Sequence, residues 1–119
     1  ATRAWTKRLV ARNAGKPPSM IHAGTYGATL HYLKAVAAAG TTDATKVVAK
    51  MKELPIDDFY TKGTVREDGR VMRPYYLLQV KKPSESKYQF DYLKLLDTVP
   101  AEQAARPLSE SACPMVKQR

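Results

Sequence analysis

The stretch that decides the fold is GTVREDGRVMRPYYLLQVK, residues 63–81. At its centre, Asp68-Gly69 favours a tight hairpin turn, because Gly and Asp tolerate the positive backbone dihedrals that such turns need. The short segments on either side, 64–66 and 70–72, are therefore predicted to pair as antiparallel strands. The next segment, 75–80, is almost entirely apolar, which is typical of a strand covered on both faces.

One clear strand does not complete an α/β domain, because the central sheet of such a domain needs several strands. The chain has 119 residues, of which 44% are hydrophobic, enough for the core of one small domain. We therefore expect the missing strands to come from sequence outside this chain, from another copy of it, or from an unusual fold. The chain also begins within a predicted helix and not with Met, so we expect a signal or a longer N-terminal part upstream.

Helices are predicted on the N-terminal side of the hairpin. A first helix is expected at 2–14, and a third runs from a cap at Thr42 or Asp43 to about Leu54. Between them, an extended lead-in at 19–22 is expected to enter a long helix that ends at Gly40. The predicted buried stripe of that long helix recurs at spacings of three and four residues and consists of Ala23, Tyr26, Leu30, Leu33 and Ala37. The short link between the last two helices predicts antiparallel packing.

The C-terminal part, 84–119, has a weaker pattern. Its apolar cluster at 90–96 fits a short helix or a strand. The rest contains three prolines and reads as an irregular tail that must lie on another surface. Cys113 is the single cysteine, which excludes an intrachain disulfide. It is either a small, partly buried apolar residue or the partner of a cysteine elsewhere in a longer parent.

The chain is basic, with 20 Lys and Arg against 11 Asp and Glu and a formal net charge of +9. The first predicted helix and the turn after it carry five cations and no acid, namely Arg3, Lys7, Arg8, Arg12 and Lys16. Elsewhere the two signs are mixed, and no aromatic RNA-binding signature or zinc-binding spacing occurs. We therefore interpret the charge as a solvated basic face and do not expect nucleic acid as a partner. A small basic protein that binds nucleic acid or an acidic partner is the alternative.

Catalytic chemistry is not indicated, and we predict that the chain is not an enzyme and has no catalytic residues, metal or cofactor. The only histidines, His22 and His31, form no HExxH motif, and His31 is expected to bond a neighbouring polar group. No serine lies in a nucleophile-elbow motif. The adjacent pair Asp57 and Asp58 favours a turn over an acid–base couple.

A ligand is best accommodated at 21–26. Free backbone amides at the start of a helix attract anions such as a carboxylate. Tyr26 offers a flat ring and a hydroxyl, and His22 lies one helical turn before it. Because Tyr26 also falls on the predicted apolar stripe, a role purely in the core is the alternative at that position.

The segment PSMIHAGTYGATLHYLKAV, 18–36, resembles the part of periplasmic branched-chain amino-acid (Leu/Ile/Val)-type ABC transporter substrate-binding proteins where an extended stretch enters a long helix through a Tyr. Residues 63–70 look like the hairpin of that family, and 75–81 look like the strand that follows it. Three short segments at 91–95, 106–108 and 113–114 resemble the tail of one bacterial subgroup. The resemblance covers essentially the whole chain and rests on the order and spacing of these segments.

The resemblance implies an α/β fold, the C-terminal portion of a two-lobed type I periplasmic binding protein. Such a portion is an incomplete three-layer sandwich, helix-rich, with a hairpin and one hinge strand. Residues 1–74 would end the N-terminal lobe with helices and hairpin. Residues 75–119 would form the hinge-crossing strand and a tail packed on the second lobe.

The resemblance also implies a function in the periplasm. The parent would be an extracytoplasmic receptor that delivers a small amino acid or an organic acid, aromatic acids included, to an ABC importer. Its partners would be that ligand, the ABC permease, and the remainder of its own chain or another copy. The apolar ligand contact of the family falls at Ile21, where amino-acid binders often have an aromatic ring, and His22 and Tyr26 are its expected neighbours.

Overall fold

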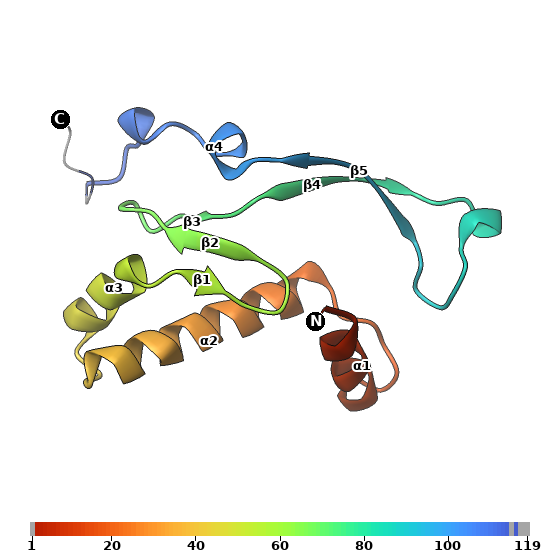
Figure 1. Ribbon diagram of the computed structural model, residues 1–119, viewed down its shortest axis with the longest axis horizontal. Coiled ribbons are helices and arrows are strands. Elements are labelled where there is room, and N and C mark those ends of the chain that lie inside the picture. Colours follow the sequence, from red (N-terminus) through yellow and green to blue (C-terminus); the bar gives the residue numbers. More distant parts are fainter. Residues whose placement is uncertain (1, 115, 117–119) are drawn as a thin grey trace.

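The computed structural model describes residues 2–114 and 116, and Figure 1 shows a helical part beside a long strand ribbon. The helices are α1 (Thr2–Arg12), α2 (Met20–Ala39), α3 (Ala44–Glu53) and the short α4 (Ala101–Ala104). The strands are β1 (Ile56–Asp57), β2 (Lys62–Val65), β3 (Val71–Met72), β4 (Tyr75–Val80) and β5 (Leu93–Val99). Single 3₁₀ turns lie at Pro83–Glu85 and Leu108–Glu110.

Helices α2 and α3 pack side by side as an antiparallel pair, as the short link predicts (Figure 1). Gly40 ends α2 in the left-handed conformation, with φ of 62°, and its N–H donates to the Val36 carbonyl at 3.0 Å. The Asp43 carboxylate accepts the Lys46 N–H at 3.0 Å and so begins α3. Across the pair, the His31 Nε2 lies 2.9 Å from the Met51 carbonyl, so His31 has the polar partner that was expected.

The start of α2 differs from the expectation. Helix, and not an extended lead-in, begins at Met20, directly after Ser19. The Ser19 N–H donates to His22 Nδ1 at 3.1 Å, which joins the residue before the helix to its first turn. Such a local bond favours helical entry, and serine is a preferred N-cap residue. Ser19 therefore indicated the start of the helix in the sequence. The prediction instead followed the apolar residues after it, which favoured an extended segment.

The buried side of α2 also differs from the predicted stripe. The helix buries Gly27, His31 and Ala35, which recur every four residues, while Tyr26 is 43% and Leu33 is 55% exposed. The reason is that α2 has apolar residues on more than one side. Within the described residues, this side faces α3 and the strands because Gly27 and Ala35 permit close approach and His31 finds a polar partner there.

Strands β1, β2 and β3 form a small antiparallel sheet. The predicted hairpin is confirmed, with Thr64 opposite Met72 and Val65 opposite Val71. Its turn closes through the Arg66 N–H to the Arg70 carbonyl at 2.8 Å, and Gly69 adopts φ of 82°. A side chain at Gly63 would place its Cβ 2.2 Å from the Met72 carbonyl oxygen, so this strand pair requires glycine there.

Strands β4 and β5 form a separate two-stranded antiparallel ribbon, hereafter the ribbon. Strand β4 has the predicted bounds. Of the two alternatives for the apolar cluster at 90–96, a short helix or a strand, the structure shows a strand from Leu93 onwards. Every residue of β4 is exposed, contrary to the expected cover on both faces. The physical reason is that the described residues contain no element that lies on the ribbon (Figure 1).

The chain is consequently extended, with a radius of gyration of 17.4 Å. A compact domain of this length would have a radius near 13.5 Å, using the usual scaling with about the 0.38 power of length. The core is correspondingly thin among the described residues. Its buried apolar side chains are Trp5, Ala35, Val47, Ile56 and Ala105.

Two ion pairs fix the ends of the strand regions. At the β2–β3 turn, the Arg66 guanidinium donates to Asp68 at 3.0 and 2.7 Å and also to the Arg106 carbonyl at 3.0 Å, which ties the tail to the hairpin. The hydrogen bond from Arg66 lowers the pKa of Asp68 to about 2. At the far end of the ribbon, Lys81 donates to both oxygens of the buried Asp91 at 2.8 Å, which holds the pKa of that carboxyl below its usual range.

We predict that Asp68→Asn makes the free energy of unfolding less dependent on pH in the acid range. The folded pKa of Asp68, about 2, lies below the ~3.9 of an unfolded aspartate, so its contribution is full above pH ~4 and is lost as the pH falls towards 2. Urea midpoints of wild type and variant should therefore differ at neutral pH and converge in strong acid. Glu67→Gln removes the adjacent exposed charge as a control. Equal profiles for the two variants would contradict the role of Asp68.

Candidate functional site

The exposed start of α2 holds the first predicted site residue, Ile21. Its side chain is 74% exposed, and that of the preceding Met20 is 84% exposed. Two large apolar side chains beside each other in water are unusual unless another surface or a ligand meets them. The first turn of a helix also has backbone N–H groups without intrahelical partners, which favour an anion. Ile21 thus places an exposed apolar side chain beside backbone amides that favour negative charge.

His22 has a local structural bond. Its Nδ1 accepts the Ser19 N–H and also lies 2.9 Å from the Ser19 Oγ. An acceptor Nδ1 places the ring proton on Nε2, which leaves that N–H as a donor for another partner. His22 therefore serves the helix start with one nitrogen and retains one donor.

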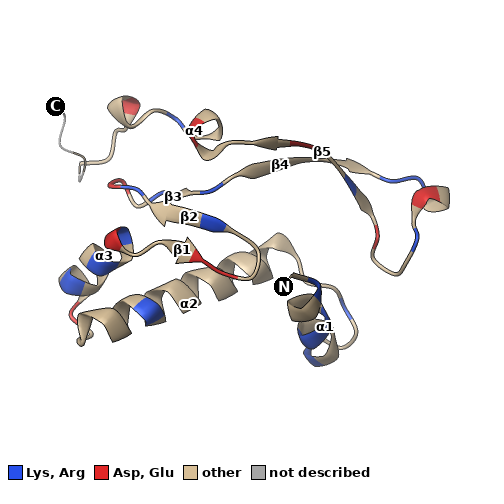
Figure 2. Ribbon diagram, viewed as in Figure 1, with Lys and Arg blue, Asp and Glu red and all other residues tan. Residues whose placement is uncertain are grey.

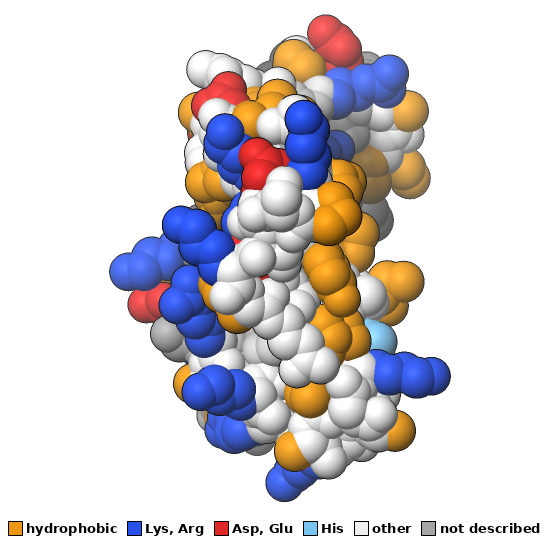
Figure 3. Space-filling model, turned by 90° about the vertical axis from the view of Figure 1, so that its right-hand side faces the viewer, with side chains coloured by type: hydrophobic (Ala, Val, Ile, Leu, Met, Phe, Trp, Pro, Cys, Tyr) orange, Lys and Arg blue, Asp and Glu red, His pale blue; other side chains and the backbone are white. Residues whose placement is uncertain are grey.

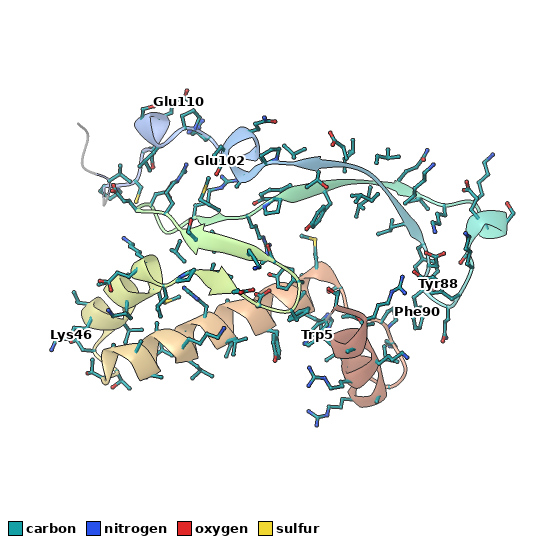
Figure 4. The ribbon with its side chains drawn as sticks, in the orientation of Figure 1. Trp5, Lys46, Tyr88, Phe90, Glu102 and Glu110 are labelled. Atoms are coloured by element: carbon teal, nitrogen blue, oxygen red, sulfur yellow. The ribbon has the colours of Figure 1, made fainter. Side chains whose placement is uncertain are left out.

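Tyr26 packs in an aromatic cluster formed by Trp5, Tyr26 and Phe59. Trp5 and Phe59 stack with centroids 4.3 Å apart, and the Tyr26 ring meets both edge-on, at 5.7 and 5.3 Å. Trp5 is only 6% exposed, and its label in Figure 4 lies between α1 and the beginning of α2. Tyr26 therefore anchors α1 to α2 and still presents part of its ring to the surface.

The three predicted residues do not share one side of α2. With 3.6 residues per turn, His22 and Tyr26 are separated by about 40° around the helix axis, whereas Ile21 and Tyr26 are separated by about 140°. A single small ligand that touches Ile21 is therefore not in direct reach of the Tyr26 ring along this helix. The three residues therefore lie at two neighbouring positions, one at the helix start and one beside the aromatic cluster.

The position beside the aromatic cluster is a cavity of about 520 Å³. Its lining residues come from α1 and α2 and are Trp5, Arg8, Leu9, Ala11, Arg12 and Tyr26. Every charged residue of α1 is Lys or Arg, coloured blue on the ribbon in Figure 2. Guanidinium groups beside aromatic rings suit an anion with an apolar part. Sequence reasoning missed this cavity, because only the tertiary contact of Trp5 brings α1 to Tyr26.

A smaller cavity of about 200 Å³ lies between α2 and the β1–β3 sheet. Its polar groups are used in the fold. The Asp58 carboxylate accepts the Tyr60 and Thr61 N–H groups at 3.0 and 2.9 Å, which confirms the predicted turn. The Arg73 guanidinium bonds the Tyr60 hydroxyl and lies over its ring, and a side chain at Gly27 would meet Asp58 Oδ2 at 2.9 Å. This cavity therefore belongs to the packing of α2 on the sheet.

The described residues, 2–114 and 116, bring no three His, Cys, Asp or Glu side chains together as a metal site would require. Within the same residues, no helix has the length and apolar character that a membrane crossing needs.

Comparison with known proteins relates the chain to one family. A family model described as periplasmic binding protein matches residues 1–87. A solved periplasmic binding protein from Burkholderia mallei is 47% identical, with a TM-score of 0.94 over 98% of this chain and 31% of that one. A branched chain amino acid ABC transporter periplasmic ligand-binding protein from Burkholderia xenovorans LB400 is also 47% identical, with a TM-score of 0.88 over 96% and 30%. No curated protein matches. The chain thus spans about a third of the length of these two structures.

We predict that Tyr26→Ala exposes Trp5, the only tryptophan of the chain. Loss of the edge-on contact should shift tryptophan fluorescence to longer wavelength and lower the unfolding free energy by about 1 kcal/mol. Tyr32→Ala is the matched control, because Tyr32 lies on the same helix and is also 43% exposed. An unchanged emission spectrum for Tyr26→Ala would contradict the packing role of this ring.

Proposed function

The chain belongs to the periplasmic binding protein family, and from this premise we propose that it is the C-terminal part of an extracytoplasmic solute receptor of an ABC importer. The observation that carries the proposal is the likeness over 98% of the chain, at 47% identity, to a periplasmic binding protein about three times as long. The proposed role is to hold a solute and not to catalyse a reaction. The proposed compartment is the periplasm, and the proposed partners are the solute and the ABC permease.

We propose that residues 1–74 end the N-terminal lobe and that residues 75–119 form a hinge crossing and the tail of the second lobe. The support is that β4 begins directly after Pro74 and that the ribbon it forms with β5 lies beside the helical part and extends past it (Figure 1). Because Arg66 reaches the Arg106 carbonyl, the two units touch at the tail. Residues 1, 115 and 117–119 of these units lie outside the described residues.

The proposed ligand contact is Ile21, with His22 and Tyr26 as neighbours. Ile21 is supported by its 74% exposure at a helix start, where a carboxylate is favoured electrostatically. His22 is supported by the N–H donor on its second nitrogen. Tyr26 is 43% exposed and lies about 140° from Ile21 around the helix, so we propose it as a neighbour of the site and not as a direct contact of a ligand on Ile21. This chemistry fits a small amino acid or an organic acid whose apolar part lies on Ile21. Closure of two lobes over such a ligand would be the state that a permease recognises.

We predict that the isolated chain binds such ligands weakly or not at all, because it provides only one wall of the proposed cleft. Calorimetry with leucine and with benzoate tests this directly. Micromolar affinity of the isolated chain for either compound would contradict the proposed division of the site between this chain and a longer parent.

The contact at Ile21 is tested in a chimera in which this chain replaces the matching 31% of the Burkholderia mallei protein. For a solute that the chimera binds, Ile21→Asp should weaken binding at least about tenfold, because a carboxylate would replace an apolar contact and repel an anionic ligand. Val48→Asp, at a 48% exposed site on α3, is the control. Equal affinity in both variants would remove Ile21 from the site.

A second candidate function is binding of nucleic acid or an acidic partner through α1. The favouring observation is that none of the ion pairs among the described residues involves the exposed cations Lys7, Arg8 and Arg12. Arg3 lies over the Tyr88 ring instead, at 5.6 Å. Charge reversal of the three exposed residues should abolish any salt-dependent shift with DNA or RNA. A shift that persists in the reversed variant would dispose of this function.

A further inference from the structure

The cavity of about 520 Å³ that α1 and α2 line differs from the smaller one in what its charged groups do. In the smaller cavity, Asp58 and Arg73 are held by hydrogen bonds within the fold. In the larger one, the charged groups are Arg8 and Arg12, and across residues 2–114 and 116 neither takes part in an ion pair or a cation–π contact. Both guanidinium groups are therefore available to an anion from outside the chain.

The spacing of these two arginines on α1 suits a single carboxylate. Residues four apart on a helix lie on the same side, with Cβ atoms roughly 5–6 Å apart, and a guanidinium binds a carboxylate through paired N–H donors. Helix α1 carries no acid that would compete for Arg8 and Arg12. On the lower part of the face in Figure 3, at the height of α1 in Figure 1, Lys and Arg side chains occur and no Asp or Glu is visible. One organic carboxylate can therefore accept from both arginines.

The rest of the lining is apolar and held in place from two sides. The Trp5 ring, which is buried, stacks on Phe59, and Tyr26 meets both rings edge-on. The Thr2 hydroxyl donates to the Phe59 carbonyl at 3.0 Å, which is a second link between α1 and this cluster. Leu9 lines the same cavity. Because these side chains are already ordered, a ligand that lies on them pays little conformational entropy.

We propose that this cavity is a binding site for a small organic carboxylate with an aromatic or aliphatic tail. The carboxylate bonds Arg8 and Arg12, and the tail lies against Trp5 and Tyr26. The volume of about 520 Å³ falls within the roughly 300–1,000 Å³ of small-molecule sites. Such a ligand fits better than a bare phosphate or a phosphate backbone, because a phosphate would use the guanidinium groups and leave the apolar half of the cavity in water.

This site is separate from the proposed contact at Ile21, which does not line the cavity. Ile21 lies about 140° from Tyr26 around α2, so one small molecule does not touch both side chains. The inference therefore goes beyond the proposed function and does not depend on a second lobe. Since all the lining residues belong to α1 and α2, the isolated chain is expected to bind this class of ligand, weakly because the cavity is open to solvent.

The test uses the fluorescence of Trp5, the only tryptophan of the chain, which lines the cavity and so reports on its occupant. Titration of the isolated chain with 3-phenylpropionate should give a saturating change with a dissociation constant of about 1 mM, as expected for a ligand of this size in an open site. Two matched compounds, 3-phenylpropionamide without the charge and acetate without the ring, should each bind at least about tenfold more weakly. No saturating change, or equal affinity for either matched compound, would overturn the proposal.

Variants of α1 test the role of the arginines. Arg8→Gln and Arg12→Gln should each weaken the binding of 3-phenylpropionate about tenfold, because each removes a charge-assisted hydrogen bond. Lys7→Gln is the matched control, since Lys7 is an exposed cation of the same helix that does not line the cavity. It changes the net charge equally and should alter the affinity less than about twofold. Equal weakening in all three variants would assign the binding to general positive charge and so overturn the proposal.

A further variant separates this site from the start of α2. Ile21→Ser should leave the affinity for 3-phenylpropionate unchanged, because Ile21 is not part of the cavity lining. Loss of binding in Ile21→Ser with retention in Arg8→Gln would place the ligand at the helix start and overturn the proposal.

Discussion

The close approach along one side of α2 is the constraint on which the helical part depends. Gly27, His31 and Ala35 recur every four residues and are buried, so α3 and the sheet can lie against the helix backbone. Gly27 leaves room for Asp58 and Tyr60, and His31 bonds the Met51 carbonyl. This row of two small residues and one hydrogen-bonded histidine thus positions both neighbours of α2. It also leaves the larger apolar side chains of the helix, such as Leu33, on the outside.

In contrast to the closely packed α2, the ribbon has regular hydrogen bonds between its strands and little side-chain packing. The ladder between β4 and β5 and the Lys81–Asp91 pair determine its shape, but neither buries apolar surface. Hydrophobic burial is the main favourable term in folding, and a segment without it derives little stability from hydrogen bonds alone. The uncovered ribbon also contributes to the extended overall shape, whose radius of gyration is 17.4 Å.

The proposed site lies at the start of α2, beside the aromatic cluster that joins α1 to α2. The helix start offers unpaired amides and an exposed Ile21, while Tyr26 leans on Trp5 and Phe59. Rigid aromatic packing behind a polar and apolar edge gives a stable wall for a ligand. It does not give a closed cleft, and in the proposed receptor the remaining wall would come from outside these residues.

Local sequence determined the features that depend on a few neighbouring residues. Asp68-Gly69 specified the hairpin turn, Gly40 and Asp43 specified the helix ends, and the apolar run specified β4, because backbone preferences and capping bonds act over short distances. Tertiary structure decided which side of α2 is buried, where α1 docks, and which residues share a face of the ribbon. Periodicity alone could not decide which side of α2 is buried, because this helix has several apolar sides. The docking of α1 depends on the contact of Trp5 with Phe59, which lies 54 residues away in the sequence. The faces of the ribbon depend on the register shift between Leu77 and Leu78, which leaves Leu96 unpaired in the ladder. The family resemblance, carried by the order of the segments, was visible in the sequence, whereas the position of Ile21 away from Tyr26 followed only from the early start of α2.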